Sequence, residues 1–188
     1  MTWSYLGLAA LDALLLIAGL GALYGLGLVR SGRDALRHAG LVLIAGWAAV
    51  GIADSLALML GAPLNRWVVG PLAVATAVAG VLVGRRVPSY RMPVLGEPGR
   101  ASWVAVAGAA VVFVQLAALL RRALDAGAST QFDAWAFWLP KARSIVDFGG
   151  LDTALGGFTS FANPGYPPLV PALDASAFAF MGLSLIHI

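Results

Sequence analysis

Long, nearly uncharged apolar runs constrain this chain more than any other feature of its sequence. They cover residues 5–29, 40–61, 67–84 and 102–120, and a fifth run covers residues 169–182. A helix needs about 20 consecutive apolar residues to cross a hydrocarbon layer about 30 Å thick. Only 11% of the residues are charged and 60% are hydrophobic, whereas a soluble domain has about 25% charged residues. The sequence therefore predicts an all-α, polytopic transmembrane helix bundle with four complete spans and a truncated fifth.

Composition also excludes several classes of function. Cysteine is absent, so the chain has no disulfide framework and no thiolate nucleophile. The net charge is only +3, and the basic residues stand in short loops beside apolar runs, which is typical of lipid-facing charge. We therefore expect membrane lipid as a partner and no nucleic acid. The oligomeric state does not follow from the sequence.

The distribution of Lys and Arg predicts the orientation of the chain. Arginines gather after the first and third apolar runs, whereas the loop after the second run holds only Arg66. By the positive-inside rule, the first and third loops are cytoplasmic. The N-terminus and the loop 121–168 are then extracytoplasmic, in a multi-pass protein of the inner (plasma) membrane. The first run is long and lacks a basic segment before it, so we expect an uncleaved signal anchor.

The last six residues, 183–188, read LSLIHI. This hexapeptide matches the in-frame translation of a transposase adaptor used in sequencing libraries, and the alternative is a natural apolar helix start. We interpret it as an artefact and assign no function to His187. The fifth apolar run is then interrupted after Gly182, so the chain is expected to be the N-terminal part of a longer protein.

Residues 133–148 predict an amphipathic helix that lies on the outer membrane surface. At 100° per residue, one face collects Trp135, Trp138, Leu139, Ala142, Ile145 and Val146. The opposite face holds Asp133, Ser144 and Asp147, with Lys141 and Arg143 flanking it. Tryptophans favour the headgroup level of a bilayer and charges favour water. Pro140 should bend this helix or start a second turn.

Residues 132–182 contain the segments FDAWAFWLPKA, FGGLD and YPPL in this order. Their order resembles that of the membrane glycosyltransferases of GT-C fold that use polyprenyl-phosphate sugars. These are the protein mannosyltransferase and aminoarabinose transferase relatives. The resemblance covers residues 132–182 and rests on FDAWAFWLPKA, FGGLD and YPPL. Asp133 matches the acidic residue of the family's first outer loop, and residues 167–169 match its membrane re-entry element. Four apolar runs precede the acid here, where the family commonly has one, and Ala134 stands where many relatives have a second acid.

The resemblance implies transfer of a sugar from a polyprenyl-phosphate donor to an extracytoplasmic acceptor, with inversion at the anomeric carbon. Asp133 would be the catalytic base that takes the proton of the acceptor hydroxyl. Lys141 and Arg143 would bind the donor phosphate, and Tyr166 completes the predicted substrate site. No cofactor is predicted, and a divalent metal that holds the phosphate stays open.

Each of these residues also has a purely structural interpretation. Asp133 can cap the start of the outer helix. Lys141 and Arg143 can anchor that helix at lipid headgroups. Tyr166 can belong, with the two prolines after it, to a stiff turn before a helix.

Two aspartates lie inside predicted spans. Asp12 is in the first run and Asp54 is in the second, where a charged side chain costs roughly 2.5–3.5 kcal/mol on insertion scales. They must face protein or water, so either pairing within the bundle or a functional role accounts for them. For the whole chain, the alternative to an enzyme is a polytopic transporter or a membrane scaffold without chemistry.

Overall fold

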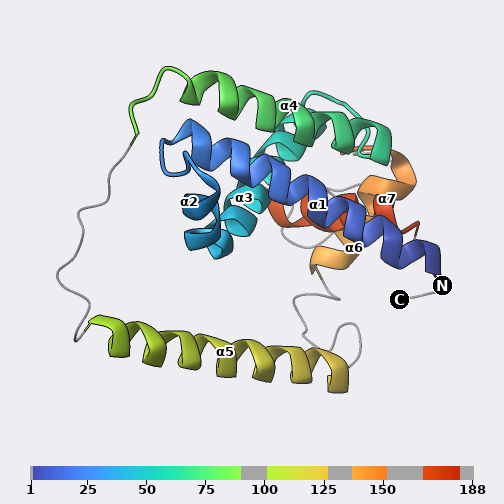
Figure 1. Ribbon diagram of the computed structural model, residues 1–188. Coiled ribbons are helices and arrows are strands. Elements are labelled where there is room, and N and C mark those ends of the chain that lie inside the picture. Colours follow the sequence, from blue (N-terminus) through green and yellow to red (C-terminus); the bar gives the residue numbers. More distant parts are fainter. Residues whose placement is uncertain (1, 90–100, 127–136, 152–166, 183–188) are drawn as a thin grey trace. The chain divides into compact units, whose positions relative to one another are not determined.

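The computed structural model describes residues 2–89, 101–126, 137–151 and 167–182, and in these residues every regular element is a helix. The predicted all-α class is therefore confirmed for the described part of the chain. The helices are α1 (Thr2–Gly25), α2 (Gly32–Arg37), α3 (Ala39–Met59), α4 (Arg66–Gly84), α5 (Ala101–Ala126), α6 (Leu139–Phe148) and α7 (Leu169–Met181). α1 to α4 form one compact unit with α6 and α7, and α5 belongs to a second unit (Figure 1).

Among the described residues, three helices are long and apolar enough to cross a membrane, namely Tyr5–Gly25 in α1, Ala39–Met59 (α3) and Arg66–Gly84 (α4). Their outward-facing side chains are as apolar as their inward-facing ones. Half or more of the surface is exposed for Ile17, Ile44, Ile52 and Leu82. A bundle in water places polar residues on its outer faces, so these exposed apolar faces fit contact with lipid. The chain has the character of a membrane protein.

Two further apolar helices are shorter. In α5 the apolar part covers Val106–Ala118, and α7 covers Leu169–Met181. α5 as a whole begins one residue before the predicted span 102–120 and continues to Ala126. The fourth crossing and the truncated fifth crossing stay predictions.

Glycines let α1 and α3 pack backbone against backbone. A Cβ atom added to Gly46 of α3 would collide with the carbonyl oxygen of Leu15 in α1. A Cβ atom added to Gly19 of α1 would in turn collide with the carbonyl oxygen of Val42 in α3. Lipid tails are as apolar as leucine, so membrane helices associate largely through such close van der Waals contact between small residues. Each helix thus supplies a glycine to the contact, and α1 and α3 pack closely at these positions.

The contact between α1 and α4 uses the same chemistry. Gly80 of α4 lies so close to Gly21 of α1 that a Cβ atom on either residue would overlap backbone of the other helix. One turn further along α4, Gly84 leaves room for the ring of Tyr24. α1 is thus held between α3 and α4 by glycines on two of its faces.

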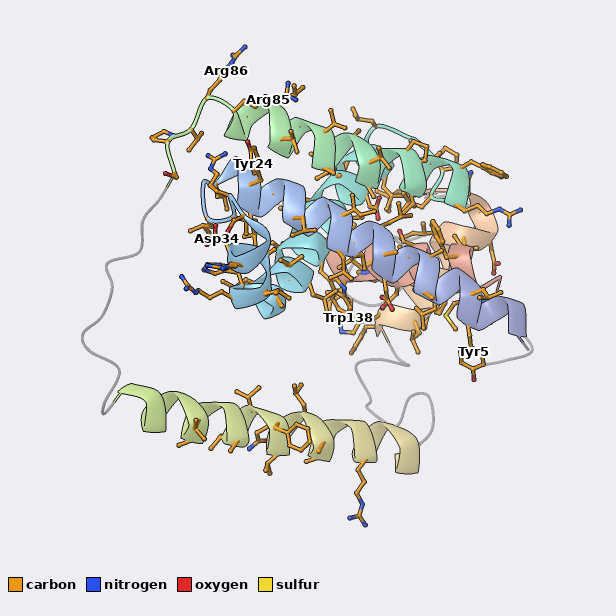
Figure 2. All side chains as sticks on the ribbon, viewed as in Figure 1. Tyr5, Tyr24, Asp34, Arg85, Arg86 and Trp138 are labelled. Atoms are coloured by element: carbon orange, nitrogen blue, oxygen red, sulfur yellow. The ribbon has the colours of Figure 1, made fainter. Side chains whose placement is uncertain are left out.

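One end of this unit is rich in arginine. We call residues 26–38 and 85–89 the arginine-rich end. Arg30 joins its two loops, because its guanidinium donates a hydrogen bond to the carbonyl oxygen of Val87 and lies 4.3 Å from the centre of the Tyr24 ring. Figure 2 shows Tyr24, Asp34, Arg85 and Arg86 together at this end, with Tyr5 at the opposite end.

α6 lies at the other end of the bundle. It packs against α7, and its C-terminal Gly149 comes close to Pro63 in the loop between α3 and α4. That loop is one crossing away from both loops of the arginine-rich end. α6 and the arginine-rich end therefore lie at opposite ends of this unit.

The first predicted span ends earlier than expected, and the loop after it contains a helix. α1 stops at Gly25, and the backbone turns through Gly27 at a φ of 76°. Ser31 then starts α2 with a capping box, in which its hydroxyl accepts from the backbone N–H of Asp34 and the Asp34 carboxylate accepts from the backbone N–H of Ser31. Reciprocal caps of this kind stabilise short helices.

Candidate functional site

The residues predicted for the site divide into two groups. Asp133, the predicted base, and Tyr166 both lie outside the described residues. Lys141 and Arg143 lie on α6, which the structure describes in full. Of the predicted site, the structure therefore describes the part on α6.

The α-helical part of α6 covers Leu139–Phe148, Phe137 and Trp138 directly before it are π-helical, and residues 133–136 of the predicted helix 133–148 lie outside the described residues. Pro140 stands in the first turn, where a missing N–H costs no intrahelical hydrogen bond. The sequence predicted that Pro140 either bends the helix or starts a turn, and its place in the first turn of α6 fits the start of a turn. The helix ends at Gly149, whose φ of 76° is a left-handed conformation that glycine adopts easily.

The apolar face of α6 contacts protein. Ala142 and Ile145 are fully buried and belong to one hydrophobic cluster with Ala172 and Ala175 of α7. The predicted apolar face is thus correct at these two positions. Its partner is the bundle itself, and not only the lipid surface that the sequence suggested.

The predicted water-facing side of α6 is wrong for Ser144, and Lys141 does not flank it. Ser144 is 3% exposed and Lys141 is 0% exposed. The prediction assumed that the membrane is the only apolar neighbour of α6. In the structure α7 also packs along α6, and the hydrophobic cluster that they share covers a wider part of the α6 surface. Burial lowers the pKa of Lys141 below the ordinary lysine value.

Arg143 and Asp147 do lie on the outer side of α6, as predicted. The Arg143 Nε atom donates to the Asp147 Oδ2 atom at 3.2 Å, one helical turn away. Both side chains are partly exposed, and such a pair contributes only about 0.3–0.5 kcal/mol. A phosphate can therefore replace the carboxylate at the guanidinium at little cost.

A buried polar pair inside the bundle was not predicted. Asp54 of α3 is 0% exposed, and its Oδ2 atom lies 2.8 Å from the hydroxyl of Ser176 in α7. The same hydroxyl lies 2.9 Å from the carbonyl oxygen of Ala172, and its single proton serves one acceptor at a time. The other carboxylate oxygen of Asp54 has no hydrogen-bond partner within the described residues. Asp54 thus pairs within the bundle, which is one of the two interpretations that the sequence left open.

Beside this pair, a pocket of about 170 Å³ opens between α1, α3 and α7. Its polar lining residues are Asp12, Asp174 and Ser176, and Trp47 adds an aromatic wall. The remaining lining is aliphatic, and the described lining contains no basic side chain. Asp12 thus lines this pocket. Asp174 lines it too, which the sequence analysis did not predict. The available signal was an acidic residue inside an apolar run, the criterion that did single out Asp12 and Asp54.

Comparison with protein-family models, with curated proteins and with solved structures gives no match to this chain. In the described residues, no group of three histidine, cysteine or acidic side chains is placed to hold a metal ion.

Proposed function

We propose that this chain is the N-terminal part of an inner-membrane glycosyltransferase of GT-C type, which moves a sugar from a polyprenyl-phosphate carrier to an extracytoplasmic acceptor. One observation carries the proposal. The segment that resembles the family's outer helix packs as α6 against α7, which begins with the re-entry element, at the end of the bundle opposite the arginine-rich end. An outer helix fixed against the start of the following span is what a site at the membrane surface needs.

The residues then divide the chemistry between them. Asp133 takes the proton of the acceptor hydroxyl as that oxygen attacks the anomeric carbon, and the bond from this carbon to the carrier phosphate breaks. Arg143 is the better phosphate ligand of the two cations, because its guanidinium is on the accessible side of α6 and offers a planar fork of donors. Lys141 is buried, so its contribution is to the position of α6.

The direct test is a transfer assay. The full-length protein, reconstituted in vesicles, should release polyprenyl phosphate from a radiolabelled polyprenyl-phosphate sugar in the presence of a membrane extract as acceptor source, and the product should have the inverted anomeric configuration. The readout is the label in the product, separated from the lipid donor. No transfer from any of a panel of such donors would overturn the proposal.

A polytopic transporter is the second candidate, and the pocket lined by Asp12 and Asp174 favours it. Intramembrane acids next to a cavity commonly mark an ion or substrate path. This function predicts uptake of solute or cations into vesicles without any sugar transfer. The same reconstituted vesicles therefore distinguish the two candidates.

The orientation that this function requires is tested separately. The chain has no cysteine, so single cysteines can be placed freely. A cysteine at Ser129 should react with an impermeant maleimide added outside intact cells, and one at Ser89 should react only after the cells are broken. The reversed pattern would put Asp133 on the cytoplasmic side, away from the proposed acceptor.

A further inference from the structure

Four arginines of the arginine-rich end point outward without a role in the fold. Arg33 and Arg37 belong to α2, and Arg85 and Arg86 follow the last residue of α4. All four side chains are exposed. Within the described residues they make no hydrogen bond and no ion pair, although Arg37 lies close enough to Asp34 to interact with it electrostatically.

Arg30 joins the two loops that carry these four charges. Because it bonds to Val87 and stacks on Tyr24, it fastens the loop that carries Arg33 and Arg37 to the loop that carries the other pair. Figure 2 shows Arg85 and Arg86 on the same side of the bundle as Asp34, which lies in α2. The two loops that carry these charges are therefore joined at the same end of the bundle before any ligand arrives.

Little negative charge opposes them. Asp34 is the single acidic residue among residues 26–38 and 85–89. Its Oδ2 atom already accepts from the hydroxyl of Ser31 and from the backbone N–H groups of Ser31 and Arg30. The Ser31 hydroxyl, the backbone N–H groups and the charge of Arg37 together lower the pKa of Asp34. Its carboxylate is thus committed to the helix cap, and the surface keeps a net positive charge.

An apolar side chain lies among these arginines. Leu36 of α2 is 80% exposed, between Arg33 and Arg37 in sequence. A short helix with an exposed leucine and flanking arginines, at the ends of apolar spans, suits the boundary between headgroups and acyl chains. We infer that the arginine-rich end is a binding surface for the headgroups of anionic phospholipids. The inference is independent of the proposed function.

Native mass spectrometry of the purified chain tests it. Phosphatidylglycerol should be retained in preference to phosphatidylcholine, and the preference should weaken as salt is raised during lipid loading. Arg33→Gln/Arg37→Gln and Arg85→Gln/Arg86→Gln should each reduce the preference by roughly thirtyfold, since each basic residue near an anionic surface contributes about 1 kcal/mol and each variant removes two. Arg30 is left in place in both variants because it holds the loops together.

Arg66→Gln is the matched control. Arg66 stacks on Trp67 at the opposite end of the bundle, so its replacement should leave the lipid preference within about twofold of wild type. Circular dichroism checks that the variants keep their helix content. Equal retention of the two lipids by the wild type, or an equal loss in Arg66→Gln, would overturn the inference.

Discussion

In the full-length protein, Asp133→Asn should lower the rate of sugar transfer at saturating donor by at least about a hundredfold. General base catalysis contributes about 10²–10⁴-fold, and an amide cannot take the proton of the acceptor. Asparagine keeps the size of the side chain and its ability to cap a helix, so a structural role would survive the change. Initial rates in reconstituted vesicles measure the first effect, and thermal melting measures the second.

Asp34→Asn is the control for this experiment. It removes a carboxylate from the arginine-rich end, far from the proposed site, and the new amide oxygen can still accept from the backbone N–H of Ser31 in the capping box of α2, so transfer should continue at the wild-type rate. If Asp133→Asn turns over as fast as this control, Asp133 is a cap and the catalytic base lies elsewhere in the protein.

Gly46→Leu should destabilise the bundle by about 3 kcal/mol, at the upper end of the usual cost of overpacking. The atoms that the new side chain meets are backbone atoms of α1, which no rotamer change can move away. We expect a lower melting temperature in detergent, measured by the change in tryptophan fluorescence on heating. The far-ultraviolet helix signal should persist below the transition, because single helices remain stable in an apolar environment.

Gly70→Leu is the matched substitution for this test. Gly70 lies inside α4, and a Cβ atom there meets nothing within 4 Å. The change should be neutral or slightly stabilising, since glycine lowers helix stability by about 1 kcal/mol relative to alanine. Equal melting temperatures for the two variants would show that the contact of α1 with α3 does not depend on the glycine.

The spans could be predicted because hydropathy depends on neighbours in sequence. The runs 40–61 and 67–84 correspond to α3 and α4 within two residues at each end. The first run was extended to Val29, whereas α1 ends at Gly25. Val29 is buried after the end of α1 and Leu28 packs against the same cluster, and hydropathy does not distinguish burial in a turn from burial in a span.

Contacts between distant segments could not be predicted in the same way. The face of α6 was assigned with lipid as its only apolar neighbour, and the cluster with α7 reversed the assignment for Ser144. The pair of Asp54 and Ser176 joins two helices whose relative rotation no local pattern gives. The capping box of α2, in contrast, is a local pattern. Ser31 and Asp34 are three residues apart, and this spacing is a sequence signal for a helix start.

The bond between Asp54 and Ser176 has a consequence for biogenesis. The two residues are 122 positions apart, and ribosomes add about 5–20 residues per second, so the hydroxyl is synthesised roughly 6–24 s after the carboxyl group. An α3 helix that enters the bilayer as it is synthesised therefore does so before its polar partner exists. During that interval water, lipid headgroups or the insertion machinery must solvate the acid. The arrival of α7 ends this dependence, which makes the docking of α7 a late and decisive step in the assembly of the bundle.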